Sequence, residues 1–217
     1  MKTGGHCVFV TGGTGYLGRP MIAELLRRGH QVRALVRAGS ESKLPAGCEA
    51  ILGDALDGGS YVEKISPADT FVQLVGVSHP SPAKAEQFRK IDLISATGAI
   101  KAAANAGIQR FIYVSVAQPA PVMKAYIEER AEGEAMLQRS GMHATVLRPW
   151  YVLGPGHRWP YALIPMYWLM GLIPATRAGA RRLGLVTLAQ MTRALIHAVE
   201  NPADGMRVLE VPEIRRF

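Results

Sequence analysis

The strongest constraint on the fold of this chain is a glycine-rich turn between an apolar run and a helical pattern. The turn reads TGGTGYLG over residues 11–18, after the apolar run 6–11 and at the head of an amphipathic pattern over 15–28. Glycine permits positive φ angles, lets backbone N–H groups approach a pyrophosphate, and allows a helix to pack close to a sheet. The turn therefore predicts a dinucleotide-binding site at Gly12, Thr14, Gly15, Tyr16, Leu17 and Gly18.

The rest of the chain alternates short apolar runs with longer helical patterns. Strands are predicted at 6–11, 31–36, 50–52, 70–75, 111–115, 144–148 and near 206–210, and helices at about 15–28, 83–106, 122–139 and 187–200. Buried parallel strands read as continuous apolar runs, and the helices between them cover both faces of the sheet. The pattern predicts an α/β fold with a Rossmann-type, doubly wound parallel sheet of about seven strands.

No repeat or linker divides the sequence, so residues 1–217 are expected to form a single domain. Residues 150–185 are rich in Trp, Tyr, Pro and Gly, and we expect them to form a small C-terminal cap on the substrate side of the sheet. Within the cap, residues 159–175 are apolar but broken by proline and glycine, and too short to predict a membrane-spanning helix. They are interpreted as a pocket-lining or partner-facing segment, with contact to a membrane surface as the alternative.

The composition bears on partners and location. Lys and Arg number 25 against 17 Asp and Glu, and the formal net charge of +8 suits an anionic ligand. The basic residues are scattered along the chain, so nucleic acid is not predicted as a partner. Cys7 and Cys48 lack the spacings of zinc or redox sites, so no metal site is predicted, and the N-terminus lacks an apolar signal core. A cytoplasmic location is expected, and the oligomeric state stays open.

Several motifs resemble the short-chain dehydrogenase/reductase superfamily, and within it the atypical, NmrA-like and complex-I-accessory-like NAD(P)H-binding proteins. The resemblance covers about residues 8–211. It rests on TGGTGYLG at 11–18, VRALVR at 32–37, GDALD at 53–57, FIYVS at 111–115, YIEER at 126–130 and LRPWYVLGPG at 147–156. The resemblance implies a Rossmann domain that binds NAD(P)(H).

The end of the second predicted strand bears on the choice of cofactor. Arg37 stands where an acidic residue would accept the ribose 2′-hydroxyl of NAD. A guanidinium instead attracts a 2′-phosphate and can bind it bidentately. Arg37, with Ser40 and Lys43 in the following loop, therefore predicts that NADP(H) is preferred over NAD(H), the alternative being a solvated charge at a strand end.

The resemblance also implies cofactor contacts farther along the chain. It places Asp54 at the adenine amino group, with an ordinary turn aspartate as the alternative interpretation. The segment after the fourth strand would lie beside the middle of the cofactor and the nicotinamide ribose, and the turn after the sixth strand would fix the nicotinamide carboxamide. These predicted contacts are Gly76, Val77, Ser78, Pro149 and Val152.

The candidate catalytic residues are Ser115, Tyr126 and Arg130. In reductases that this sequence resembles, a serine after the fifth strand orients the substrate carbonyl, a tyrosine donates a proton, and a lysine four residues later binds the nicotinamide ribose. Tyr126 and Arg130 are four residues apart, so they share one helix face. Arginine replaces the lysine, and it stays protonated and planar. A tyrosine and an arginine packed on a helix surface are the alternative.

Two functions follow from these residues. The first is an NADP(H)-dependent reductase of a small hydrophobic carbonyl-type substrate, with Tyr126 as the proton donor. The second is a protein that binds NADP(H) without turnover, as a redox sensor or as an assembly or accessory subunit.

Overall fold

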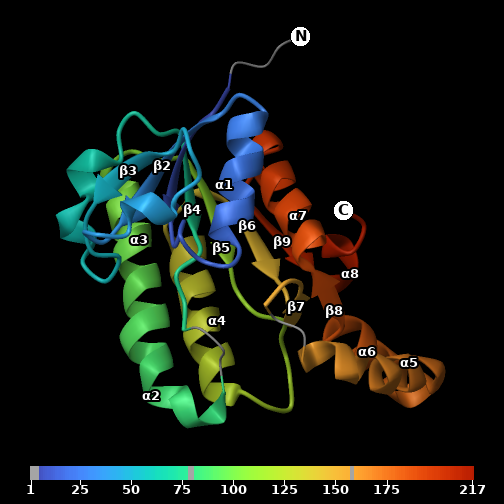
Figure 1. The fold of residues 1–217 in the computed structure, drawn as a ribbon. Coiled ribbons are helices and arrows are strands. Elements are labelled where there is room, and N and C mark those ends of the chain that lie inside the picture. The colour runs from blue at the N-terminus through green and yellow to red at the C-terminus, as the bar shows by residue number, and fades with distance from the viewer. Residues whose placement is uncertain (1–4, 78–80, 157–158) are drawn as a thin grey trace.

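The computed structural model describes residues 5–77, 81–156 and 159–217, and a seven-stranded sheet forms its centre (Figure 1). Every neighbouring pair of strands in this sheet is parallel. The order across the sheet is β3 (Glu49–Leu52), β2 (Gln31–Val36), β1 (Cys7–Thr11), β4 (Thr70–Gln73), β5 (Arg110–Val114), β6 (His143–Arg148) and β9 (Met206–Glu210). The prediction of a doubly wound parallel sheet of about seven strands is confirmed.

Helices cover both faces of the sheet (Figure 1). One face carries α1 (Gly18–Arg27), α7 (Leu188–Glu200) and α8 (Val211–Ile214), and the other carries α3 (Ile94–Asn105) and α4 (Lys124–Arg139). Short 3-10 segments lie at Glu41–Lys43, Gly58–Ser60, Val62–Lys64 and Pro82–Lys84. The single helix expected over 83–106 is divided into α2 (Ala85–Gln87), a π-helix (Phe88–Leu93) and α3, because apolar spacing does not distinguish a π-helical turn from an α-helical one.

Alternate residues of the central strands belong to two apolar cores. Val8 and Val10 of β1 pack with α1 and α7, whereas Phe9 packs on the opposite face with α3. Phe9, Phe71 and Phe111 stand in register on β1, β4 and β5, with neighbouring ring centroids 5.3 and 5.1 Å apart. Burial on both faces explains why these strands read as continuous apolar runs instead of alternating patterns.

The strand order reverses direction between β1 and β4. From β1 the chain first adds β2 and β3 on one side, and then returns to add β4, β5, β6 and β9 on the other. The two crossovers leave a crevice outside the carboxyl ends of the strands, which is where open α/β sheets bind ligands. The glycine turn predicted from the sequence follows β1 directly at this crevice.

Residues 150–185 add a small second sheet and two helices. β7 (Tyr151–Leu153) pairs in parallel with β8 (Leu185–Thr187), and between them lie the 3-10 segment Trp159–Leu163, α5 (Ile164–Leu172) and α6 (Pro174–Arg182). In Figure 1, α5 and α6 project from the lower right of the molecule, at the same end as the carboxyl ends of the strands. Of the helices in the described part of the chain, none is long and apolar enough to cross a membrane.

Candidate functional site

The glycines of the turn between β1 and α1 meet different demands. Gly12 has φ +76°, and a Cβ on it would lie 2.9 Å from the carbonyl carbon of Leu74. A Cβ on Gly18 would lie 2.4 Å from the Gly12 oxygen, so the helix could not start so close to the turn with any other residue. A Cβ on Gly15 meets only that same oxygen, at 3.1 Å. Gly12 and Gly18 are therefore required by the fold, whereas a side chain on Gly15 would make one tight contact, with the backbone of the turn.

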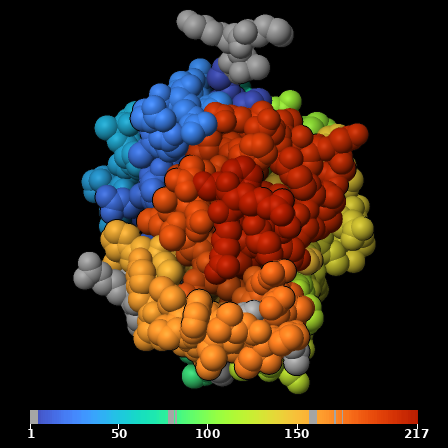
Figure 2. All heavy atoms as spheres, turned by 90° about the vertical axis from the view of Figure 1, so that its right-hand side faces the viewer, coloured from blue at the N-terminus to red at the C-terminus, as the bar shows by residue number. Residues whose placement is uncertain are grey.

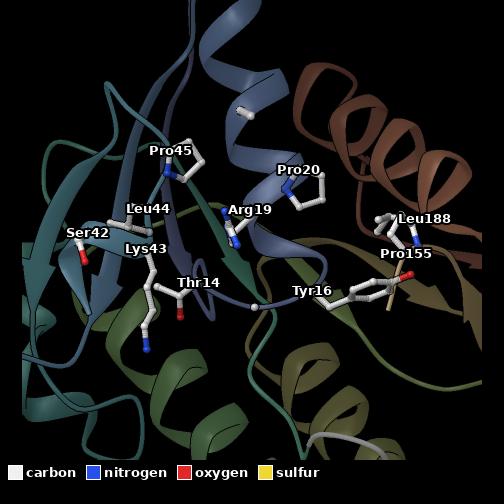
Figure 3. Close-up of a pocket in the computed structure, with 12 residues that line it drawn as sticks. Thr14, Tyr16, Arg19, Pro20, Ser42, Lys43, Leu44, Pro45, Pro155 and Leu188 are labelled. Carbon is white, nitrogen blue, oxygen red and sulfur yellow. The ribbon is translucent and has the colours of Figure 1, made fainter. Parts of the chain in front are cut away.

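Gly15 faces a cavity of about 590 Å³ (Figure 3). One wall consists of Thr14, Gly15 and Tyr16 of the turn with Arg19 of α1, and another comes from the loop that carries Lys43. Arg19 and Lys43 bring two cations to this cavity beside the N-terminus of α1, which carries its own partial positive charge. The combination suits an anionic ligand such as a phosphate.

The loop after β2 carries the three residues predicted to bind a 2′-phosphate. The Ser40 N–H donates to the Arg37 oxygen at 3.0 Å, and the Lys43 N–H donates to the Ser40 oxygen at 3.1 Å. The Arg37 side chain is exposed and makes no hydrogen bond or ion pair with any residue that the structure describes. Lys43 lines the 590 Å³ cavity, whereas Arg37 and Ser40 lie outside its lining.

Asp54 organises the loop after β3. Its Oδ1 accepts a hydrogen bond from the Leu56 N–H at 2.9 Å, and its own N–H donates to Ser60 Oγ at 2.9 Å. This arrangement is the local turn that Asp commonly makes with its own backbone. The turn role is present in the structure, and the predicted contact with adenine stays a prediction.

A second cavity, of about 360 Å³, lies where β4, β5 and β6 end. Tyr16 and Pro155 line both cavities, so the two lie on either side of this pair. The second cavity brings together most of the residues predicted for the nicotinamide end and the chemistry: Gly76, Val77, Ser115, Tyr126, Arg130, Pro149 and Val152. Leu17, predicted as part of the glycine turn, lines this cavity as well. Ser78, the other prediction for this region, lies outside the described residues.

Ser115 and Tyr126 both line the second cavity. The Ser115 N–H donates to the Leu147 oxygen at 2.8 Å, and the residue is 3% exposed. Its Oγ has no hydrogen-bond partner among the residues that the structure describes. Tyr126 packs on Phe88 with ring centroids 4.8 Å apart. A buried hydroxyl without a partner is costly, so a ligand that bonded Ser115 would relieve that cost.

Arg130 is buried, and its guanidinium is held by main-chain oxygens and a carboxylate. One Nη donates to the Val114 oxygen at 2.9 Å, and the other donates to the Val75 oxygen at 3.4 Å and to Asp92. The guanidinium carbon also lies 5.3 Å from the centre of the Tyr126 ring, which confirms that both side chains share one face of α4. Arg130 does not lie on the exposed surface of the helix, because α4 turns this face toward the ends of β4 and β5. Its contacts are those of a packed structural residue, and the catalytic role of Tyr126 and Arg130 stays a prediction.

Asp92 is a residue of this site that sequence analysis missed. It is fully buried in the π-helix, where one carboxylate oxygen meets Arg130 and the other accepts the Val77 N–H at 3.0 Å. Burial raises the pKa of the Asp92 carboxyl, and the charge of Arg130 opposes that shift. The sequence held one signal for this residue. Asp92 is a lone carboxylate between Ile91 and Leu93, on a helix predicted to pack against the sheet.

The same pair explains Gly76. A Cβ on Gly76 would lie 2.1 Å from an Nη of Arg130 and 2.9 Å from Oδ1 of Asp92. No side chain fits there while the ion pair is in place. The glycine predicted for cofactor contact is thus already required by packing against Arg130.

Arg19 was also missed by sequence analysis. It stands in the first turn of α1, where a cation is unfavourable beside the positive end of the helix. A basic residue directly after a glycine turn is therefore a signal for a bound anion that could have been found in the sequence.

A parallel sheet with a switch point, a glycine turn that opens α1, and two adjoining cavities at the carboxyl ends are the features of a dinucleotide-binding protein. The chain belongs to the NAD(P)H-binding family, which matches residues 12–158. The NAD(P)H-binding family that the sequence motifs implied is thereby confirmed.

Named relatives include reductases. The chain is 28% identical over 227 residues to the 3-diazoavenalumate denitrifying reductase of a Streptomyces species, covering 91% of this chain and 73% of the relative. It is 31% identical over 143 residues to the 4-hydroxy-2-methyl-3-oxo-4-farnesyl-3,4-dihydroquinoline-1-oxide ketoreductase of Stigmatella aurantiaca, covering 65% of this chain. The match spans only 40% of that ketoreductase.

Among solved structures, the fold is similar to that of the Bordetella bronchiseptica enzyme WbmH in complex with NAD+. The TM-score is 0.71 at 19% identity, over 94% of this chain and 75% of WbmH. At this identity the similarity concerns the fold alone.

Proposed function

We propose that this protein is an NADP(H)-dependent reductase of small, apolar carbonyl compounds. The observation that carries the proposal is that Ser115 and Tyr126 line one cavity, which adjoins the cavity at the glycine turn. A dinucleotide would extend over both cavities, with its phosphates in the cavity at the glycine turn and its nicotinamide in the second cavity. The named ketoreductase among the relatives supports a carbonyl substrate.

The residues of the glycine-turn cavity fit a bound dinucleotide. Gly15 leaves room for a pyrophosphate beside the N-terminus of α1, and Arg19 and Lys43 supply positive charge. Arg37, exposed and unpaired within the described residues, is available to a ribose 2′-phosphate. A guanidinium stabilises a phosphate by charge and by paired hydrogen bonds, which favours NADP(H) over NAD(H).

The second cavity fits the reduction itself. The cofactor, when bound, would supply a hydride to the carbonyl carbon. The Tyr126 hydroxyl would transfer its proton to the carbonyl oxygen, and the Ser115 hydroxyl would donate a hydrogen bond to that oxygen, so the carbonyl becomes an alcohol. Val116, Trp150 and Val152 line the same cavity with apolar surface, which suits a hydrophobic substrate.

The proposal is tested by NADPH oxidation over a panel of aldehydes, ketones and quinones, with Tyr126→Phe compared against wild type on the best substrate. General acid catalysis contributes typically ~10²- to 10⁴-fold, and the variant should lose activity by about that factor. Its affinity for NADPH, measured by protein fluorescence, should stay close to wild type. The matched control is Tyr151→Phe, which makes the same change at another tyrosine that lines the cavity. Equal rates for Tyr126→Phe and wild type would contradict the role of Tyr126.

One observation favours a second function, the binding of NADP(H) without turnover. Arg130 stands where active reductases that the sequence resembles carry a ribose-binding lysine, and its two Nη groups are already bonded to Val114, Val75 and Asp92. A sensor or accessory subunit would need the cofactor to stabilise the fold and nothing more. Thermal stabilisation by NADPH together with no turnover across the panel would decide for this second function.

A further inference from the structure

Helix α5 is apolar on every side. Its residues read IPMYWLMGL over Ile164–Leu172, without a single charged side chain. On its outward side Trp168 is 68% exposed, Leu169 56% and Leu172 54%, and Ile164, Met166 and Ile173 are exposed beside them. A helix that is hydrophobic all round normally lies within a protein or a membrane. The outward side of α5 is therefore exposed to solvent, although an apolar helix of this kind is normally buried.

The next helix, α6, adds positive charge to this apolar surface. It carries Arg177, Arg181 and Arg182, and it contains no acidic residue. Arg181 lines a cavity of about 510 Å³ together with Tyr167 and Trp168 of α5, so cation and aromatic rings are neighbours. Figure 2 shows α5 and α6, in orange, as a lobe along the lower edge of the molecule, below α7 and α8.

The sequence around α5 and α6 contains no acidic residues. No Asp or Glu occurs between Glu134 and Glu200, although the chain has 17 acidic residues in all. The lobe thus combines exposed aliphatic and aromatic side chains with arginines and lacks acidic residues of its own. Peripheral proteins bind anionic membranes with this combination, placing Trp and Leu at the boundary of headgroups and acyl chains and Arg on the lipid phosphates.

We propose that the outward side of α5 and α6 docks on the surface of an anionic lipid bilayer. Trp168, Leu169 and Leu172 insert at the headgroup level, and Arg181 contacts lipid phosphates. A second copy of the chain fits this surface less well, because a two-fold contact through α5 and α6 would bring the arginines of both copies together. The proposal does not depend on the proposed reductase activity.

The test uses the full chain and two kinds of vesicle, one of phosphatidylcholine alone and one that also contains phosphatidylglycerol. The protein should sediment with the anionic vesicles and be released by salt, since surface charge attraction is screened. Tryptophan emission should shift to shorter wavelength on binding, and Trp168→Phe should remove most of that shift.

Three variants separate the apolar and charged contributions. The double variant Leu169→Asp with Leu172→Asp should lose sedimentation with anionic vesicles. Arg181→Glu should weaken binding roughly 5- to 25-fold, since each basic residue near an anionic surface is worth about a fivefold change in affinity. Arg139→Glu makes the same charge change at the exposed C-terminal end of α4 and should have a smaller effect. All four substituted positions are exposed, and each variant's NADPH-induced rise in melting temperature would show that its fold is intact.

The proposal is overturned by any of four results. The first is no sedimentation with anionic vesicles at low ionic strength. The second is an equal loss of binding in Arg181→Glu and Arg139→Glu. The third is unchanged binding in the Leu169 and Leu172 double variant. The fourth is a dimer in light scattering that the double variant dissociates, with no binding to vesicles, which would assign the surface to a second copy of the chain.

Discussion

The buried ion pair of Arg130 and Asp92 makes a prediction that can be worked out from the structure. Replacing Arg130 by methionine keeps a side chain of similar length beside Tyr126 but leaves the Asp92 carboxylate without its cation. Removing one partner of a buried pair costs ~3–5 kcal/mol. For a domain of this size each kcal/mol lowers the melting temperature by ~2–4 °C, so a decrease of about 6–20 °C is expected. Thermal unfolding at neutral pH measures it.

The pH dependence of that loss identifies Asp92 as its cause. Burial raises the pKa of Asp92, and Arg130 opposes the shift, so the pKa should rise further in Arg130→Met. A carboxyl whose folded-state pKa is raised lowers stability at pH values above that pKa, and the loss is relieved as the pH falls through it. The difference in melting temperature between Arg130→Met and wild type should therefore shrink as the pH is lowered from neutral.

A second variant separates the charge from the shape. In the double variant Asp92→Asn with Arg130→Met no charge stays buried, and replacing both partners of a buried pair is often neutral or stabilising, so much of the loss should be recovered. Arg139→Met, at the exposed end of the same helix, should change the stability by no more than ~0.5 kcal/mol. A loss that is the same at every pH and is not recovered in the double variant would refute the account of the buried charge.

Three further predictions concern the cofactor site. Gly15→Val should leave the fold largely intact but block the approach of a pyrophosphate. At one hundred times its dissociation constant, NADPH should raise the melting temperature of the wild type by about 5–11 °C, and the variant should lose that rise. Arg37→Asp should weaken NADPH binding roughly 10- to 100-fold and NADH binding much less, as fluorescence titration with both cofactors would show; equal losses would remove the 2′-phosphate contact. Gly76→Ala should destabilise the protein by ~1–3 kcal/mol in urea unfolding without cofactor, since the new methyl group overlaps the Arg130 guanidinium, and an unchanged midpoint would contradict that packing.

The fold was largely predictable from the sequence because buried parallel strands leave a simple trace. Each central strand is covered on both faces, so it appears as a short apolar run, and the glycine turn after β1 fixes the type of connection. β7 and β8 were missed because each has three residues and lies in the irregular segment 150–185. A run that short is not distinguishable from a loop by its periodicity.

The candidate site was only partly predictable. Residues that follow strand ends, such as Ser115 and Val152, could be found because parallel strands bring their carboxyl ends to one edge. Asp92 could not be found in this way, because it pairs with Arg130, which lies 38 positions farther along the chain on a different helix. No local pattern encodes that pairing, which depends on how the π-helix and α4 pack over the ends of β4 and β5.

Gly76, near the predicted nicotinamide position, and Gly15, near the predicted phosphate position, differ in what they show about cofactor binding. Gly76 needs no ligand to explain it, because Arg130 and Asp92 already occupy the space of a side chain there. Gly15 has an ordinary φ and meets no side chain, and its one tight contact would be with the Gly12 oxygen, so a ligand in the adjoining cavity gives a separate reason for it to stay small. A variant at Gly15 therefore tests the cofactor site, whereas a variant at Gly76 tests the ion pair beneath it. If Gly76→Ala also lowered NADPH affinity in protein that unfolds at the wild-type midpoint, the ion pair would not be the reason for that glycine.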